Sequence, residues 1–112
     1  MKRSLSYLVL ALLVSLIPVS TAMAEIPKGP IKIGVVMPTT GPIAYDGRLT
    51  LNGIEMAVNE VNKSGGIKGN KIELFVEDSA NVPATAVAAM EKLVGMQKVT
   101  FVIGDFGSSC TL

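Results

Sequence analysis

The chain has 112 residues, with 10 basic and 9 acidic side chains, one cysteine and no histidine. Without histidine there is no Ser-His-Asp triad, no Cys-His pair and no histidine metal site within these residues, so an enzyme is disfavoured and no cofactor is expected. The small net charge leaves no basic surplus for nucleic acid. Cys110 alone cannot build an internal disulfide framework; it is a free thiol, a small buried side chain, or half of a pair whose partner lies beyond residue 112.

The first 24 residues have the three-part layout of a secretory signal peptide. Lys2 and Arg3 give a positive start, residues 7–19 carry no charge, and an A-x-A sequence ends at Ala24. This apolar run is shorter than the ~20 residues that span a bilayer. We therefore expect cleavage after Ala24 and export to the periplasm. The mature chain, residues 25–112, has 8 basic and 9 acidic residues, hence a net charge of −1, and is not expected to insert into the membrane.

A buried strand and a helix are predicted next. The segment from Ile31 to Met37 is almost entirely apolar and rich in β-branched residues, which is typical of a strand covered on both faces. A helix is expected from about Asp46, as its N-cap, to Lys63, after which Ser64-Gly65-Gly66 ends it. Apolar side chains recur within it at three- and four-residue steps: Ile54, Ala57, Val58 and Val61.

A second strand, a second helix and a third strand follow. Apolar and charged residues alternate from Lys71 to Asp78, which indicates a strand nearer the sheet edge, and Asp78 is expected to serve a turn or cap. The next helix opens at Pro83, with Asn81 as a candidate cap. The stretch from Val99 to Ile103 predicts another buried strand. The second helix has an apolar stripe made of Ala86, Val87, Met90, Leu93 and Val94.

The order β-α-β-α-β predicts an α/β fold in which helices cover a parallel sheet. The buried character of the first and third strands fits the spatial order 2-1-3. Ligands of such sheets bind beyond the carboxyl ends of the strands, where the strand order reverses. Two loops leave those ends, residues 38–46 and residues 104–111, and the second contains the sequence Gly-Ser-Ser-Cys.

Candidate ligand-binding residues lie in these two loops. Ser108 and Ser109 precede the next expected helix, where backbone N–H groups and hydroxyls attract anions such as a carboxylate; equally, either serine caps that helix. Tyr45 either packs on a ligand or covers the sheet end, and Asp46 lies at the same mouth. A dinucleotide site is disfavoured, because the first loop lacks G-x-G-x-x-G.

The loops and helix ends resemble those of a known family. The sequence from Thr40 to Gly47 looks like the S/T-G-x-x-A-x-x-G loop of type I periplasmic binding proteins, in their branched-chain amino acid group. The stretch from Asn62 to Gly69 matches their N-x-x-G-G-I-x-G helix end, and Val102-Ile103-Gly104 leading into Ser108-Ser109 continues the match. The resemblance covers residues 31–112.

This resemblance implies the first part of a two-lobed protein. Residues 25–112 would begin a Rossmann-like N-terminal lobe, left incomplete at this length. The whole protein would close around a small solute and deliver it to the permease subunits of an ABC importer in the inner membrane. A receptor or sensor domain on the same fold, which passes closure to a signalling partner, is the alternative.

The family's binding residues carry over onto both loops. By resemblance, Ser108 would bind the carboxylate of an amino acid or related solute, through its hydroxyl or the backbone N–H groups of the turn that it shares with Gly107 and Ser109. Tyr45 and Asp46 would line the wall of the cleft.

Two positions depart from the family pattern. Many relatives have proline after the glycine that aligns with Gly104, whereas this chain has Asp105, a carboxylate that would either repel an acidic solute or point to solvent. Some amino acid binders carry a disulfide between the positions of Asn81 and Gly107, so that bridge is absent here. The chain is also expected to leave its third strand with an open edge and, as an isolated polypeptide, not to bind solute tightly.

Overall fold

The computed structural model describes residues 28–111. The predicted signal peptide, residues 1–24, lies outside the described residues, so its cleavage stays a prediction. Within the described part, no helix combines the length and apolarity needed to cross a membrane. The elements follow in the order β1 (Ile31–Met37), α2 (Ala44–Lys63), β2 (Ile72–Asp78), α3 (Pro83–Glu91), the π-helix η1 (Lys92–Met96), β3 (Phe101–Ile103) and α4 (Ser108–Thr111).

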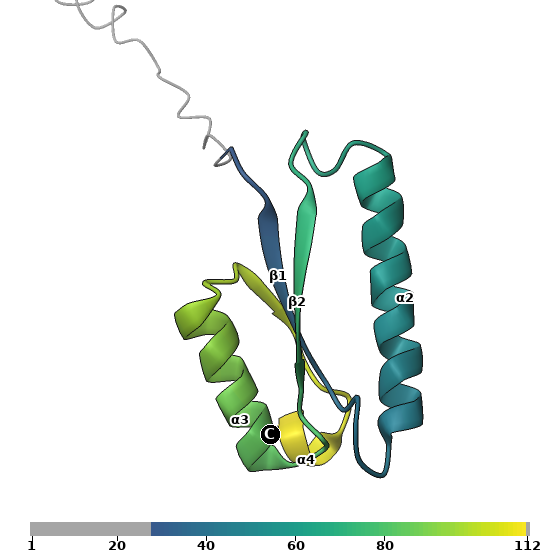
Figure 1. Ribbon diagram of the computed structural model, residues 1–112, viewed down its shortest axis with the longest axis vertical. Coiled ribbons are helices and arrows are strands. Elements are labelled where there is room, and N and C mark those ends of the chain that lie inside the picture. Colours follow the sequence, from purple (N-terminus) through teal and green to yellow (C-terminus); the bar gives the residue numbers. More distant parts are fainter. Residues whose placement is uncertain (1–27, 112) are drawn as a thin grey trace, which may run out of the picture.

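The three strands form one parallel sheet in the order β2-β1-β3. β1 pairs with β2 along its whole length, from Ile31 opposite Ile72 to Met37 opposite Asp78. α2 lies on one face of the sheet and α3 on the other (Figure 1). Right-handed crossovers place the helices in this way, because the connections to β2 and to β3 run in opposite directions across the sheet. The predicted α/β class and the strand order 2-1-3 are confirmed.

α3 packs on the sheet through one narrow line of residues. Ala86, Ala89 and Leu93 are buried and form the core with Val36 of β1. A Cβ atom at Gly34 would lie 2.9 Å from Leu93 Cδ1, so the glycine in β1 lets α3 and η1 come close. The broader predicted stripe is wrong in part. Each of its other members comes one residue after a member of the buried line, so it lies about 100° further round the helix and faces away from the sheet. These residues are exposed: Val87, Met90 and Val94.

β3 is shorter and more exposed than predicted. It begins at Phe101 instead of Val99, because Lys98 has a left-handed backbone (φ 53°) and Val99 turns its N–H to the carbonyl of Leu93. Within the described residues β3 pairs with β1 alone. Phe101 is therefore 61% exposed. The third strand has the expected open edge, and the prediction that it is buried is wrong.

α2 begins earlier than predicted. Gly41 has a left-handed backbone (φ 85°), and Ala44 donates its N–H to the Gly41 carbonyl at 3.2 Å, so the helix starts at Ala44 after Ile43 in the cap position. Asp46 lies in the first turn and is not the N-cap. Its negative charge there interacts favourably with the positive end of the helix dipole. At α3, Pro83 opens the helix as predicted, but Val82 is in the cap position in place of Asn81.

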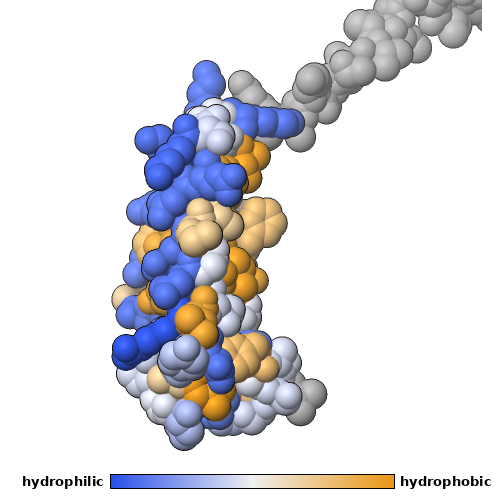
Figure 2. Space-filling model, turned by 90° about the vertical axis from the view of Figure 1, so that its right-hand side faces the viewer, coloured by the Kyte–Doolittle hydropathy of each residue, from blue (hydrophilic) through white to orange (hydrophobic). Residues whose placement is uncertain are grey.

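The inner face of α2 is half-buried against the sheet through residues that include Ile54, Val58 and Val61. Ala57, which was expected on the same stripe, is exposed. Figure 2 looks onto the outer face of α2, where hydrophilic side chains dominate and apolar ones are interspersed. This side of the structure therefore resembles an ordinary solvated surface.

Candidate functional site

Three turns meet at the carboxyl edge of the sheet, at the lower end of Figure 1. The first follows β1, the second joins β2 to α3, and the third joins β3 to α4. Hydrogen bonds of two aspartates, Asp78 and Asp105, tie the first and third turns to the second. This edge is where ligands of parallel α/β sheets bind.

Asp78, the last residue of β2, holds the loop after β1. Its Oδ1 accepts the backbone N–H groups of Thr39 at 2.8 Å, Thr40 at 3.2 Å and Ala80 at 2.9 Å. Its Oδ2 accepts the hydroxyl of Thr40 at 2.5 Å. Burial acts to raise the pKa of this carboxyl, but the hydrogen bonds from the Thr40 hydroxyl and the three N–H groups outweigh it and lower the pKa to about 2. The predicted turn or cap role of Asp78 is confirmed.

The turn between β2 and α3 has an unusual backbone. Ala80 and Asn81 are both left-handed, with φ of 50° and 57°, a conformation that costs non-glycine residues about 1 kcal/mol or more each. Ser79, which is fully buried, offsets this cost. It donates its N–H to Met37, and its carbonyl and hydroxyl oxygens accept the N–H groups of Val82 at 2.9 Å and Asn81 at 3.3 Å.

Asp105 turns inward from the end of β3. It is 9% exposed, its Oδ2 accepts the hydroxyl of Ser79, and its Oδ1 accepts the N–H of Gly107 at 2.8 Å. Of the two alternatives for this carboxylate, repulsion of an acidic solute or orientation toward solvent, the second is wrong, because the buried Ser79 hydroxyl offers it a partner inside the protein. Sequence reasoning missed Ser79 altogether; a serine that follows the last residue of a strand carries no signal of such a contact.

The serine turn, which we define as Gly107–Ser109, packs against Asn81. A Cβ atom at Gly107 would lie 2.4 Å from Asn81 Oδ1, and Ser109 donates its hydroxyl to the same oxygen at 3.4 Å. Ser108 is exposed at the start of α4. Within residues 28–111, no hydrogen bond is donated by the backbone N–H of Ser108 or Ser109. Cys110 is a half-buried free thiol against the core.

Tyr45 and Asp46 lie on the first turn of α2, at the same edge of the sheet as the serine turn. Tyr45 is 76% exposed, and Asp46 is exposed as well. In the described part of the chain, no hydrogen bond joins either residue to Ser108 or Ser109. The two groups of predicted site residues therefore share an edge but are not in contact through hydrogen bonds.

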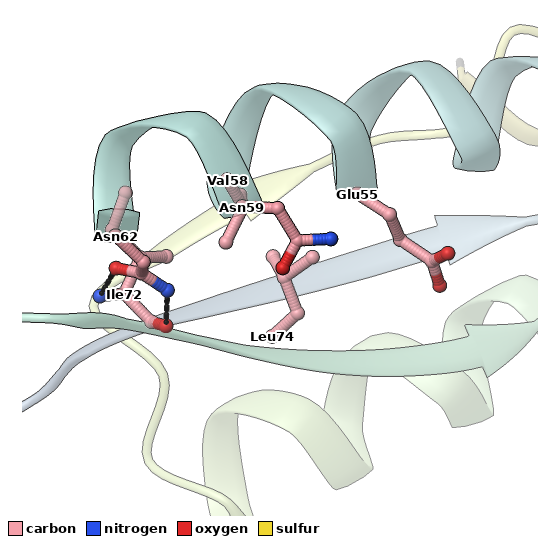
Figure 3. Close-up of a pocket in the computed structure, with 6 residues that line it drawn as sticks. All are labelled: Glu55, Val58, Asn59, Asn62, Ile72 and Leu74. Atoms are coloured by element: carbon pink, nitrogen blue, oxygen red, sulfur yellow. Dashed lines mark hydrogen bonds between the residues drawn. The ribbon is translucent and has the colours of Figure 1, made fainter. Parts of the chain in front are cut away.

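A separate groove of about 270 Å³ lies between α2 and β2 (Figure 3). Glu55, Asn59 and Asn62 reach into it from the helix, and Ile72 and Leu74 line it from the strand. Asn62 donates its amide to the carbonyl of Ile72 at 2.8 Å and accepts the N–H of Ile72 at 2.7 Å. Because Ile72 begins β2, the groove lies toward the amino end of that strand, away from the three turns. Asn62 fastens the end of α2 to the edge of the sheet.

The match to known proteins agrees with this geometry. Residues 30–112 match the model of the periplasmic binding protein family, and the chain belongs to that family. A Leu/Ile/Val-binding protein, BraC3, of Rhizobium johnstonii is 40% identical over 93 residues, which are 83% of this chain and 25% of the relative. The Leu/Ile/Val-binding protein of Escherichia coli K12 is 42% identical over 81 residues, 72% of this chain and 22% of the relative.

Solved structures show the same fold. The branched-chain amino acid transporter substrate-binding protein LivJ of Streptococcus pneumoniae, in complex with isoleucine, superposes with a TM-score of 0.71 and 35% identity, over 73% of this chain and 24% of that one. The chain therefore spans about a quarter of the length of the relatives that it matches.

Proposed function

We propose that this chain is part of an extracytoplasmic solute-binding protein that serves an ABC importer. The observation that carries the proposal is the family match over residues 30–112, with relatives of about 40% identity that are named for binding leucine, isoleucine and valine. The protein would be exported to the periplasm, capture a small solute without catalysing its conversion, and pass it to the permease subunits in the inner membrane.

The solute would bind at the carboxyl edge of the sheet. Ser108 would offer its hydroxyl to the solute carboxylate. The N–H groups of Ser108 and Ser109, which donate to no partner among residues 28–111, would add two donors. Tyr45 and Asp46 would lie on the opposite side of the site, exposed to a ligand that the rest of the protein closes over. The solute class that fits is an amino acid, or a related acid or amide, of small size.

Because the chain spans about a quarter of its relatives' length, we expect binding to need the remaining segments of such a protein, and the test uses a hybrid. Residues 30–112 replace the matching segment of the Escherichia coli Leu/Ile/Val-binding protein. The hybrid is screened by thermal shift against branched-chain amino acids, amides and aromatic acids, and the best solute is measured by calorimetry. We expect at least one carboxylate-bearing amino acid to bind, and Ser108→Ala to weaken it roughly 10-fold or more, the value of a hydrogen bond to a charged group.

A matched control is Ser64→Ala. This serine lies at the far end of α2, and its hydroxyl donates to the carbonyl of Glu60 and to no other group among residues 28–111, so its replacement should leave affinity unchanged. Equal effects of the two substitutions, or a folded hybrid that binds no screened solute, would overturn the proposal.

A further inference from the structure

The carboxylate of Asp105 joins two turns that are distant in sequence. Its partner Ser79 is 26 residues away and fully buried, and Gly107 supplies the second bond, to the other oxygen, at 2.8 Å. The two oxygens therefore hold the serine turn on one side and the turn after β2 on the other. Both ends of this contact lie away from solvent, where hydrogen bonds are electrostatically stronger than in water.

The turn after β2 is a firm base for this contact. The N–H of Ser79 donates to Met37 of the central strand at 3.1 Å, and its hydroxyl both donates to Asp105 and accepts the N–H of Asn81. A left-handed backbone at Ala80 and Asn81 persists only where its surroundings hold it. Asp105 is thus bonded to a turn whose position follows from β1.

We propose that Asp105 and Ser79 are positioning residues of the solute site, which set the orientation of the serine turn without touching the solute. This inference rests on the proposed function. By taking the N–H of Gly107, Asp105 orients the peptide units that follow, so that the N–H groups of Ser108 and Ser109 stay free for the solute carboxylate. Thr111 supports the same arrangement, because its hydroxyl lies 3.0 Å from the carbonyl oxygen of Asp105 and 2.9 Å from that of Gly107 and shares its one hydrogen between them.

The negative charge of Asp105 should weaken solute binding, whereas its positioning of the serine turn should strengthen it. A carboxylate near the site repels a carboxylate-bearing solute. Both of its oxygens already accept hydrogen bonds inside the protein, which reduces the field that reaches the solute. The two roles predict opposite outcomes for Asp105→Asn: positioning predicts weaker binding, and repulsion predicts tighter binding.

The experiment measures binding of L-isoleucine, or of the best solute from the screen, by the hybrid and its variants. We expect Asp105→Asn to raise Kd roughly 10- to 100-fold, because a neutral amide with a single acceptor oxygen replaces a charged carboxylate that accepts two hydrogen bonds. Ser79→Ala should act in the same direction, because it removes the hydroxyl that donates to this carboxylate. Glu73→Gln makes the same carboxylate-to-amide change on the exposed side of β2 and should alter Kd less than about 2-fold. Unchanged or tighter binding by Asp105→Asn would overturn the inference.

A covalent rescue separates positioning from other roles. The side chain of residue 81 reaches the place where a Cβ of residue 107 would lie, so Asn81→Cys with Gly107→Cys can join the same two turns by a disulfide. Cys110→Ala removes the competing thiol. In the oxidised form this bridge should restore the affinity lost in Asp105→Asn, and reduction should abolish the gain. Failure of the oxidised bridge to restore binding would count against positioning.

Amide hydrogen exchange gives a readout that does not depend on the solute. Asp105→Asn should speed exchange of the Gly107 N–H roughly 10-fold or more, since a weaker, neutral amide acceptor replaces the charged acceptor of that N–H. Weaker binding with unchanged exchange at Gly107 would refute the inference while leaving the proposed function intact. An unmodified hybrid that binds no solute would refute the proposed function, and the exchange rate would still decide whether Asp105 fastens the turn.

Discussion

The loop after β1 and the serine turn leave the same edge of the sheet, and an aspartate fastens each of them by a different arrangement. Asp78 gathers three N–H groups and a hydroxyl at a partly accessible position. Asp105 is buried and, among the residues that the structure describes, accepts one N–H and one hydroxyl. More donors hold the first loop, so the loss of any one donor should loosen the serine turn more than it loosens the first loop.

The loop after β1 also depends on close packing, which gives the largest expected effect. A Cβ atom at Gly47 would lie 2.0 Å from the carbonyl oxygen of Pro38, a backbone atom that cannot move aside cheaply. We expect Gly47→Ala to destabilise the hybrid by about 3 kcal/mol. Thermal unfolding without solute measures this effect. Gly53→Ala in the same helix meets nothing within 4 Å and should be neutral or stabilising; similar losses at both sites would contradict the packing argument.

Substitution of Asp78 tests the four hydrogen bonds of the first loop. Asp78→Asn should lower the free energy of unfolding by about 2 kcal/mol at neutral pH, because an amide oxygen replaces a charged acceptor. The pKa of Asp78 is lower in the folded chain, about 2, than the ordinary 3.8. As the pH falls, the unfolded chain takes up its proton first, so the contribution of Asp78 is complete above about pH 5 and declines toward pH 2.

Unfolding of the parent and of Asp78→Asn at a series of pH values checks this dependence. The difference in stability between the two proteins should shrink as the pH falls below about 4. A difference that stays constant from neutral pH down to pH 2 would show that the charge of Asp78 does not stabilise the loop.

The serine turn should respond more mildly to added volume. A Cβ at Gly107 meets the side-chain oxygen of Asn81 at 2.4 Å, and a side chain can rotate away where a backbone carbonyl cannot. Gly107→Ala should therefore cost about 1 kcal/mol. Adding Asn81→Gly should recover most of that loss, since it removes the obstructing atom and suits the left-handed backbone. Gly104→Ala, which meets nothing within 4 Å, is the control in thermal unfolding.

Local sequence patterns were sufficient for the elements and for much of the topology. The β-branched run of β1, the Gly-Gly end of α2 and the proline that opens α3 each reflect a backbone preference that acts within a few residues. Alternation of strand and helix then restricts the sheet to parallel pairing. These features can be predicted without knowing which distant residues are in contact. The family motifs in the loops are also short local sequences, so they could be recognised in the same way.

Only the tertiary structure decided which apolar residues are covered and how the turns are joined. Val87 is exposed because α3 turns a different line of residues toward the sheet, and Phe101 is exposed because β3 lies at the sheet edge. Both arrangements depend on contacts between segments that are far apart in the sequence. The contact of Asp105 with Ser79 likewise joins residues 26 positions apart, and no periodic pattern in the sequence predicts it. The direction in which a buried side chain points follows from the partner that the fold brings near, and a single sequence contains no local record of that partner.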